Sequence, residues 1–325
     1  MRVHILDDWF DTLRSLPSFA KLAGHGVTVW NNHTEDAPTL AARLAQAEAL
    51  VLFRERTPIT ADLLARLPGL RLISQRSVYP HVDVAACTAH KVLLCSNMHA
   101  DGHSVAAAEL TWALILATAR QLTQQNAAIK VGNWQMGVGQ TLRGRTLGLY
   151  GYGRIARAVA GYARAFGMDV VWWASDAGRT RAIAAGETVA SSRSDFFASA
   201  DFVSLHVRLK PETKGLIIAQ DLAQMKPTAS FINTSRAQLV QPGALLAALN
   251  AGRPARAGID VFEVEPLTAP DDPLVHHPHV TATPHIGYVT EDELDMQFSD
   301  IYDQINAYAA GAPSHMINPS VWPNG

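Results

Sequence analysis

Residues 147–156 read Leu147-Gly148-Leu149-Tyr150-Gly151-Tyr152-Gly153-Arg154-Ile155-Ala156, a G-x-G-x-x-A pattern that joins an apolar run to a helix-like segment. Gly151 permits a tight turn, Gly153 lets the backbone approach a pyrophosphate, and Ala156 is small enough for a helix to pack closely on a strand. The N–H groups at the start of a helix attract phosphates. With a further apolar run at residues 170–173, the stretch predicts a strand–turn–helix that binds a dinucleotide. The alternative is a tight turn without a ligand.

Short apolar runs alternate with helix-like segments on both sides of this stretch. They lie at residues 3–6, 27–30, 49–53, 70–74 and 92–95 before it, and at 170–173, 202–206, 229–233, 256–260 and 280–283 after it. A long helix is expected at residues 104–122, and a last helix at 291–310. Such alternation is typical of parallel sheets with helices on both faces. We therefore predict the α/β class, with two doubly wound parallel-sheet domains.

The composition is that of an ordinary globular chain. Of its 325 residues 48% are hydrophobic and 17% are charged, which excludes a disordered or collagen-like chain. The formal net charge of −2 gives no basic field for nucleic acid or an anionic membrane. Cys87 and Cys95 are too few for a disulfide framework or a four-cysteine metal site, so we expect buried free thiols and no metal.

The sequence shows no pattern of export or membrane insertion. The first apolar run, residues 3–6, leads directly into Asp7 and Asp8 without a basic leader. The longest uncharged run near the middle, residues 110–119, is about half of a membrane span. We expect a cytoplasmic protein that is not bound to a membrane.

The preference between NAD and NADP depends on the end of the strand at 170–173. Dinucleotide-binding domains place an acid there, about twenty residues after the glycines, to bind the adenosine ribose. Here the position falls on Ala174, so the acid is missing or displaced to Asp176, and Ser175 and Asp176 are the expected ribose contacts. Arg179 and Arg181 could attract a 2′-phosphate, whereas Asp176 opposes one. The choice stays open, with the balance slightly toward NAD.

Three segments follow strands in the second half: Asn233–Arg236, Gly258–Pro266 and Thr283–Gly287. The carboxyl ends of parallel strands form the ligand crevice of a doubly wound sheet. An arginine, a glutamate and a histidine in one crevice suit reduction of a 2-oxo acid, because arginine holds a carboxylate, histidine protonates the new alkoxide and glutamate orients the histidine. Each side chain taken alone could instead be a surface charge, a helix cap or a core histidine.

Further segments carry a resemblance to a known family. They are Leu52–Thr57, Leu72–Gln75, Ala108–Trp112, Gly151–Ile155, Ser204–His206, Met225–Pro227, Asn233–Arg236, Asp260–Pro266 and Pro284–Gly287. In order and spacing they resemble the D-isomer-specific 2-hydroxyacid dehydrogenases over nearly the whole chain. That family includes D-lactate, glycerate, 3-phosphoglycerate and formate dehydrogenases and glyoxylate/hydroxypyruvate reductases.

The resemblance implies a set of site residues. The catalytic set falls on Arg236, Glu265 and His285, with Glu263 facing elsewhere. The implied coenzyme contacts are Gly151, Gly153, Arg154, Ile155, Ser175, Asp176, His206, Thr234 and Asp260. The implied substrate contacts are Arg54 and the loop Arg76, Ser77, Val78 and Tyr79, which lacks the family's usual glycines. Met98, His99, Trp134 and Tyr288 are further pocket candidates.

The resemblance also implies an architecture and a reaction. A flavodoxin-like substrate domain would comprise residues 1–98 and 289–325, with a Rossmann NAD(P)-binding domain at 99–288 inserted into it and the active site in the cleft between them. A homodimer would form through the nucleotide-binding domain. The reaction would be NAD(P)-dependent hydride transfer to or from C2 of a small 2-oxo or 2-hydroxy acid, giving the D-hydroxy acid. The alternatives are a formate- or phosphite-type dehydrogenase and a dinucleotide-sensing binding protein.

Overall fold

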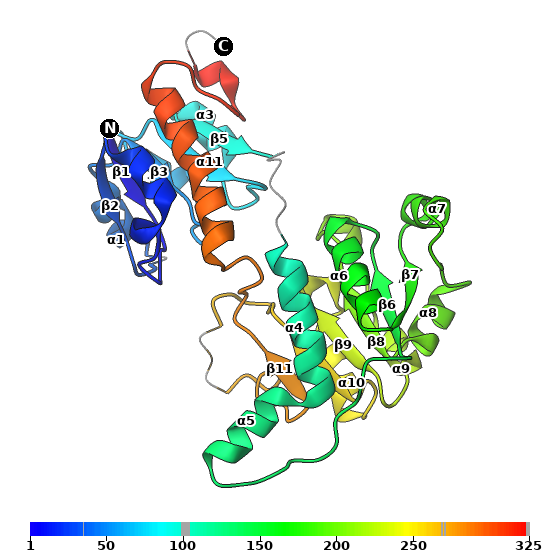
Figure 1. Ribbon diagram of the computed structural model, residues 1–325. Helices are drawn as coiled ribbons and strands as arrows, with labels where there is room; N and C mark the ends of the chain where they lie inside the picture. The colour runs from blue at the N-terminus through cyan, green and yellow to red at the C-terminus, as the bar shows by residue number, and fades with distance from the viewer. Residues whose placement is uncertain (35, 99–104, 268, 270, 323–325) are drawn as a thin grey trace. The chain divides into compact units, whose positions relative to one another are not determined.

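The structure, a computed structural model, describes residues 1–34, 36–98, 105–267, 269 and 271–322 (Figure 1). The chain divides into two compact units: unit 1 is Met1–His103 with Thr290–Gly325, and unit 2 is Ser104–Val289. The expected boundary between residues 98 and 99 adjoins residues 99–104, which lie outside the described part. Both units contain a parallel sheet with helices on both faces, which confirms the predicted fold class.

Unit 1 is built on a five-stranded parallel sheet in the order β2-β1-β3-β4-β5. The strands are β1 (Arg2–Ile5), β2 (Gly26–Val29), β3 (Ala49–Val51), β4 (Leu72–Arg76) and β5 (Leu93–Asn97). The helices are α1 (Ala37–Leu44), α2 (Ala61–Ala65), α3 (Val84–Ala89) and α11 (Glu291–Ala309), with 3-10 turns η1 (Leu13–Ser15), η2 (Pro17–Leu22) and η5 (Pro319–Val321). This strand order is the flavodoxin-like one.

The core of unit 1 has two layers of apolar side chains. On one face α1, α2 and α3 bury leucines such as Leu40 and Leu63 against the sheet. On the other face α11, drawn in orange in Figure 1, packs on β4, β5 and η2. Its Phe298 ring lies 4.9 Å from that of Phe53 between ring centroids. The C-terminal helix therefore covers one face of the sheet that the N-terminal segment forms.

Unit 2 has six parallel strands in the order β11-β10-β9-β8-β6-β7. They are β6 (Thr146–Tyr150), β7 (Asp169–Trp173), β8 (Phe202–Leu205), β9 (Ser230–Asn233), β10 (Arg256–Ile259) and β11 (Val280–Ala282). Beyond β7, Val189 forms a one-residue parallel bridge to Trp172. The Trp172 N–H donates to Thr188 O at 2.9 Å and the Ala190 N–H to Trp172 O at 3.0 Å. Counting this bridge as a strand gives the Rossmann order, 3-2-1-4-5-6, with one strand added.

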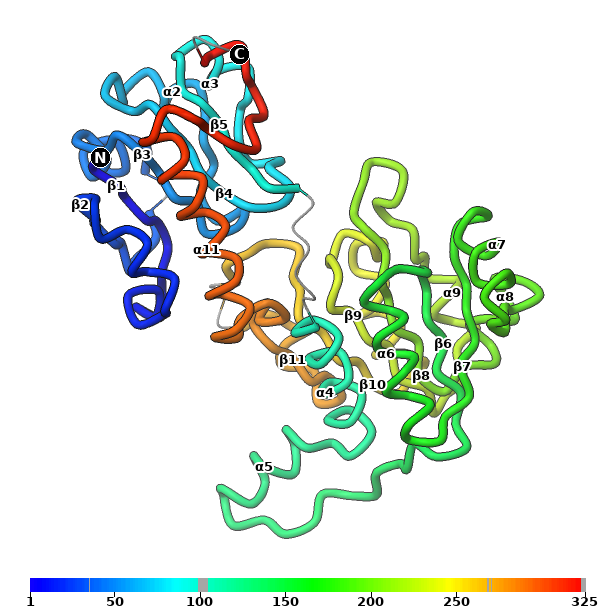
Figure 2. The backbone as a smooth tube through the Cα atoms, turned by 45° about the horizontal axis from the view of Figure 1, so that its top comes forward, coloured from blue at the N-terminus to red at the C-terminus, as the bar shows by residue number. Residues whose placement is uncertain are grey.

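Helices cover both faces of the unit 2 sheet. They are α4 (Ala106–Arg120), α5 (Leu122–Lys130), α6 (Arg154–Ala165), α7 (Asp176–Ala184), α8 (Arg193–Ser199), α9 (Ala219–Gln224) and α10 (Ala244–Asn250), with 3-10 turns η3 (Pro211–Thr213) and η4 (Ala237–Leu239). Figure 2 shows α4 beside β11, and the long chain that returns from α5 to β6. The helix expected at 104–122 corresponds to α4, which ends at Arg120 because Gln121 takes a left-handed conformation (φ 53°); the following helix α5 was not predicted.

Cys87 and Cys95 are buried free thiols, as expected. Burial raises the pKa of Cys87 to about 11 and that of Cys95 to about 12. Among the described residues, no helix is long and apolar enough to span a membrane, and no three His, Cys, Asp or Glu side chains are grouped to hold a metal ion.

Candidate active site

The turn between β6 and α6 has the geometry that a dinucleotide requires. Gly151 has a φ of +112°, and a Cβ built there would lie 2.3 Å from the carbonyl oxygen of His206. Only glycine fits this position. A Cβ on Gly153, by contrast, would meet no described protein atom within 4 Å. Packing therefore explains the first glycine, whereas the open space beside the second fits the predicted approach of a pyrophosphate.

No side chain caps the first turn of α6. Gly153 is the N-cap residue, and it has no side chain to accept a hydrogen bond from the first N–H groups. Arg154 and Ile155 are the first two helical residues. Ala156, Val159, Ala160 and Ala163 form the buried stripe that holds the helix on the sheet. A helix start fixed in this way suits a pyrophosphate, so the residues present fit a dinucleotide coenzyme.

A guanidinium from α7 lies at the end of β7, where dinucleotide-binding domains usually place an acid. Ala174 is buried, and Ser175 Oγ accepts a hydrogen bond from Gly178 N at 3.3 Å as the N-cap of α7. The Asp176 side chain is 95% exposed and pairs with Arg179. Arg179 also donates from Nη1 to Ala174 O at 2.7 Å, and its guanidinium lies 4.3 Å from the Trp173 ring centroid. Arg179 is thus held at the strand end, while Arg181 is an exposed residue of α7.

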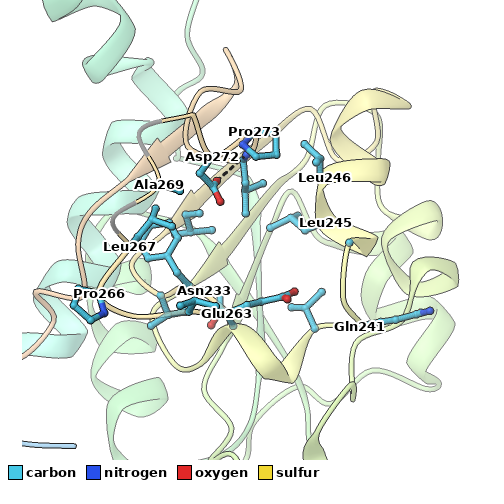
Figure 3. A pocket seen from close by; sticks show the side chains of 18 residues that line it. Asn233, Gln241, Leu245, Leu246, Glu263, Pro266, Leu267, Ala269, Asp272 and Pro273 are labelled. Atoms are coloured by element: carbon cyan, nitrogen blue, oxygen red, sulfur yellow. Dashed lines mark hydrogen bonds between the residues drawn. The ribbon is translucent and has the colours of Figure 1, made fainter. Parts of the chain in front are cut away.

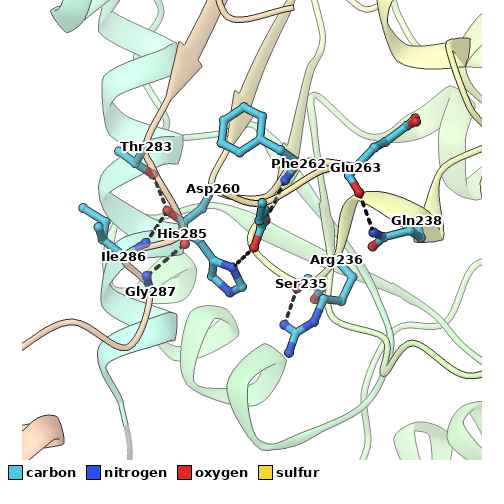
Figure 4. Close-up of polar contacts among 11 residues, drawn as sticks. Ser235, Arg236, Gln238, Asp260, Phe262, Glu263, Thr283, His285, Ile286 and Gly287 are labelled. Carbon is cyan, nitrogen blue, oxygen red and sulfur yellow. Dashed lines mark hydrogen bonds and ion pairs between the residues drawn. The ribbon is translucent and has the colours of Figure 1, made fainter. Parts of the chain in front are cut away.

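Arg236, Glu265 and His285 follow β9, β10 and β11, which are neighbours in the sheet (Figure 4). His285 Nδ1 lies 2.5 Å from Glu265 Oε2, and the Phe262 N–H donates to Glu265 Oε1 at 2.8 Å. His285 takes a left-handed conformation, with a φ of 54°. Arg236 donates from Nη1 to Ser235 O at 2.7 Å. The parallel register of three strands therefore brings these residues, up to 49 positions apart in the sequence, to one edge.

Glu265 is held in its ionised form by its neighbours. Burial alone would raise the pKa of its carboxyl group. The hydrogen bond to His285, the charges of His285 and Arg236 and the bond from Phe262 N outweigh burial, so the pKa of Glu265 lies below its ordinary value. A carboxylate at Nδ1 fixes the orientation of the imidazole ring and leaves Nε2 to face a reacting oxygen.

Asp260 fixes the loop that carries His285. It is fully buried at the end of β10, and its Oδ1 accepts from Thr283 Oγ1 at 2.6 Å and from Ile286 N at 2.8 Å. Its Oδ2 accepts from Gly287 N at 2.9 Å. Burial raises the pKa of Asp260 against these hydrogen bonds. The predicted contact of Asp260 with the coenzyme stays a prediction; the observed contacts make it a positioning residue.

The other implied coenzyme contacts lie along the same edge of the sheet. Thr234 Oγ1 is 2.7 Å from Thr111 Oγ1 of α4, so this loop is tied to the helix. His206 follows β8, and its Nε2 is 2.9 Å from Ser204 Oγ. Burial lowers the pKa of His206 to about 4, so its ring is neutral near pH 7. Glu263 is exposed and faces away from His285 (Figure 4).

The implied substrate residues of unit 1 follow β3 and β4. Arg54 and Ser77 have left-handed φ values of 61° and 75°. The buried amide of Gln75 donates to Ser77 O at 3.0 Å and to Val78 O at 3.3 Å, which fixes the loop without its usual glycines. Arg76 pairs with Asp300 of α11, with 3.2 Å from Nε to Oδ2, and its side chain is only 11% exposed. Arg76 therefore serves the packing of α11.

The remaining candidates lie apart in the sequence. Tyr79 packs at the edge of the unit 1 core, and the Tyr288 ring lies edge-on to His285, 5.6 Å between centroids. Met98 and Trp134 are exposed. His99 lies outside the described residues.

The loop after β1 is a feature that the sequence did not reveal. Asp7 takes a φ of 61°, and Arg56 donates from Nη1 to its carbonyl oxygen at 2.6 Å. The Arg56 guanidinium lies 3.8 Å from the Trp9 ring centroid. The left-handed residues Asp7, Arg54 and Ser77 thus follow β1, β3 and β4 at one edge of the sheet, and strained backbone of this kind gathers at functional sites. In the sequence, only their position after apolar runs could have indicated these three residues.

Comparison with known proteins identifies the family. Residues 112–287 match the family described as D-isomer specific 2-hydroxyacid dehydrogenase, NAD binding domain. The chain is 36% identical over 298 residues to D-3-phosphoglycerate dehydrogenase of Mycobacterium tuberculosis H37Rv, covering 91% of this chain and 55% of that one. It is 33% identical over 296 residues to glyoxylate reductase of Thermococcus litoralis, covering 87% of both. The chain spans about half the length of the curated D-3-phosphoglycerate dehydrogenases that it matches.

Solved structures agree with this result. A phosphoglycerate oxidoreductase from Vibrio cholerae O395 superposes with a TM-score of 0.90 at 42% identity, covering 96% of this chain and 100% of that one. The pyruvate reductase of Chlamydomonas reinhardtii gives a TM-score of 0.83 at 25% identity, covering 96% and 97%. With its Rossmann unit, its glycine turn and the Arg, Glu and His at three adjacent strand ends, the chain belongs to the D-isomer specific 2-hydroxyacid dehydrogenase family.

Proposed function

We propose that the protein is an NAD(P)H-dependent reductase that converts small 2-oxo acids reversibly into D-2-hydroxy acids. The observation that carries the proposal is the 2.5 Å contact of Glu265 with His285 beside Arg236, in the unit that contains the dinucleotide turn. Relatives named as glyoxylate reductase and D-3-phosphoglycerate dehydrogenase support this reaction class.

Each residue of the trio has one task in the reaction. The coenzyme, when bound, supplies a hydride to C2 of the 2-oxo acid. Arg236 offers a planar pair of donors to the carboxylate and polarises the carbonyl group. His285 donates a proton from Nε2 to the carbonyl oxygen as that oxygen gains charge. Glu265 keeps Nδ1 protonated and the ring oriented, so one hydride and one proton convert the 2-oxo acid into the 2-hydroxy acid.

Unit 1 is proposed to supply carboxylate-binding groups of its own. The backbone N–H groups of Ser77, Val78 and Tyr79 and the guanidinium of Arg54 are the groups assigned to the substrate carboxylate. Arg76 is left out of this role because Asp300 already holds it. The left-handed φ values of Arg54 and Ser77 support the assignment, because backbone strain of this kind is retained mainly at functional sites.

The coenzyme preference is proposed to depend on Arg179. Ala174 stands where an acid usually repels a 2′-phosphate, and the Arg179 guanidinium is held there by Ala174 O and the Trp173 ring. Asp176 pairs with the same guanidinium and competes with a phosphate for it. We therefore assign use of both NADH and NADPH, with Arg179 favouring NADPH and Asp176 opposing it.

A homodimer is proposed to form through unit 2. The chain from α5 toward β6 exposes large apolar side chains: Ile129 at 57%, Val131 at 74%, Trp134 at 76%, Met136 at 49% and Val138 at 89%. This run of exposed apolar side chains supports a contact with another molecule. A second copy of the chain is its proposed partner. Sedimentation velocity of the protein should give a dimer, and Val138→Glu should give a monomer; a monomeric parent protein would refute the assignment.

The test of the reaction is reduced-coenzyme oxidation with glyoxylate, pyruvate, hydroxypyruvate and phenylpyruvate, measured separately with NADH and NADPH. Turnover of any of them that is lost in His285→Ala supports the proposal. Oxidation of formate or phosphite, with no turnover of 2-oxo acids, would favour the formate- or phosphite-type dehydrogenase. Coenzyme binding without any turnover would favour the dinucleotide-sensing protein.

A further inference from the structure

Unit 2 contains a cavity of about 540 Å³ beside the chain segment that carries Glu265 (Figure 3). It lies between the start of α10 and the segment that follows β10. Its walls are apolar and include Val240, Leu245, Leu246, Ile259, Phe262 and Leu274. Figure 3 shows Leu245 and Leu246 on the opposite side of the cavity from Leu267. The volume lies in the range of small-molecule sites.

The polar groups of the wall indicate which ligands the cavity favours. Asn233 is satisfied within its own turn, because Nδ2 donates to Arg236 O at 2.9 Å and Oδ1 accepts from Ser235 N at 3.0 Å. Asp272 Oδ1 likewise accepts from Leu274 N at 2.9 Å and Val275 N at 3.0 Å. Gln241 Oε1 accepts from Ala219 N at 3.3 Å, and the rest of the wall is mainly apolar, so apolar contact dominates recognition. The two acidic side chains of the lining, Glu263 and Asp272, disfavour an anion.

We infer that this cavity is a binding site for a compact apolar molecule that is neutral or carries a positive charge, and that its occupant controls the orientation of Glu265. None of the residues that line the cavity belongs to the sets assigned to the coenzyme or to the 2-oxo acid, and both of those ligands are anionic. The control of activity, but not the binding itself, rests on the proposed function.

The coupling runs through one short segment. Phe262, Val264 and Pro266 all line the cavity, and Glu265 lies between the last two. The Phe262 N–H donates to Glu265 Oε1, while Glu265 Oε2 contacts His285. Gln238 Nε2 also donates to Glu263 O at 3.2 Å, which ties the segment to η4. A molecule inserted between α10 and this segment contacts the residues that set the Glu265 carboxylate, so occupancy and carboxylate geometry are linked.

Binding can be measured with three fluorinated probes of one shape and three charges. These are 4-fluorobenzyl alcohol, 4-fluorobenzylamine and 4-fluorobenzoate, followed by ¹⁹F NMR line broadening on the full protein without coenzyme. The alcohol and the amine should bind with dissociation constants of roughly 1 mM, as expected for ligands of this size. The benzoate should bind at this site at least about tenfold more weakly. No binding of alcohol or amine, or equal binding of all three, would overturn the inference.

Two variants that fill the cavity test its location. Leu246→Trp places a larger side chain on the α10 wall, and Leu274→Trp does so on the facing chain, so one remains informative if the other fails to fold. Either folded variant should lose binding of the alcohol. Leu246→Met, which nearly conserves volume, is the matched control and should keep it. Undiminished binding in both tryptophan variants would place the probe elsewhere and contradict the inference.

The link to activity needs a separate measurement. In the parent protein, saturating 4-fluorobenzyl alcohol should change kcat at least about twofold while KM for the coenzyme stays constant, and Leu246→Trp should abolish the effect. An unchanged kcat at saturation would overturn the coupling. Absence of any 2-oxo acid turnover would instead refute the proposed function, and the NMR measurement of binding would be unaffected.

Discussion

Glu265 Oε2 lies 2.5 Å from Nδ1 of His285, and separate contacts hold each partner in place. The Phe262 N–H fixes the glutamate, and Asp260 fixes the loop on both sides of the histidine through Thr283, Ile286 and Gly287. Both residues of the pair are therefore oriented before a substrate arrives. Preorganised charge of this kind is worth more to a reaction than charge that must be assembled during it.

Replacing either residue of this pair should separate catalysis from coenzyme binding. His285→Ala should lower kcat roughly 10²- to 10⁴-fold, because the proton donor is lost. Glu265→Gln should lower kcat on the order of 100-fold, because an amide can stabilise the wrong ring tautomer. Coenzyme dissociation constants, measured by fluorescence titration, should change less than about twofold in both variants. Parallel loss of coenzyme binding and of turnover would contradict the assigned roles.

The two glycines of the nucleotide turn should respond differently to alanine. Gly153→Ala meets no described protein atom within 4 Å, so its free energy of unfolding should change by less than about 1 kcal/mol. Its coenzyme dissociation constant should rise about tenfold or more, because the methyl group occupies the approach of the pyrophosphate. Gly151→Ala brings Cβ against His206 O at a φ of +112° and should unfold the domain or destabilise it by about 3 kcal/mol. Unchanged coenzyme binding in folded Gly153→Ala would argue against this site.

Substitutions at the end of β7 should move the coenzyme preference in opposite directions. Arg179→Ala should raise KM for NADPH about tenfold and leave KM for NADH nearly constant, since a charge-assisted contact to phosphate is lost. Asp176→Ala should lower KM for NADPH, because the guanidinium loses its competing partner. Arg181→Ala is the control and should change neither value. Equal effects of Arg179→Ala on both coenzymes would refute the proposed phosphate contact.

His206 should make the protein less stable in mild acid. Its folded pKa of about 4 lies below the ordinary 6.5, so the unfolded state binds the proton more readily. The corresponding stability is fully present above pH 6.5 and is lost as the pH falls toward 4. Between pH 7 and pH 5 the loss amounts to about 2 kcal/mol. Urea unfolding of the parent protein and of His206→Asn should show this difference in slope; identical pH dependences would mean that His206 is not held neutral by burial.

The fold was predictable because parallel α/β chains mark their strands plainly. The runs at 3–6 and 280–283 fall on β1 and β11, since strands buried on both faces are continuously apolar. The end of α4 lies within two residues of the predicted one, whereas α5 was missed because Ala128 is its only buried residue and the sequence shows no apolar stripe there. The bridge at Val189 was missed because one paired residue leaves no periodic pattern.

The site was predictable in part, for a similar reason. Arg236, Glu265 and His285 lie three to six residues after β9, β10 and β11, and the parallel topology brings such positions together. The choice of Glu265 over Glu263 came from the family resemblance. The ion pair between Arg76 and Asp300 was not predictable, because Asp300 lies on a helix more than 200 residues away in the chain. The stacking of Arg56 on Trp9 likewise depends on the conformation of two loops that no local pattern specifies.

In the proposed reaction a hydride passes from the coenzyme to C2 of a 2-oxo acid while His285 donates the proton. The most direct test uses reduced coenzyme carrying deuterium at C4, as separate 4R and 4S isomers, with hydroxypyruvate or glyoxylate as acceptor. Mass spectrometry of the product should find one deuterium at C2 from one isomer only, chiral analysis of the hydroxypyruvate product should give the D enantiomer, and His285→Ala should abolish the label on the assay timescale. Product without deuterium at C2 from either isomer, or no product from any 2-oxo acid, would contradict the account.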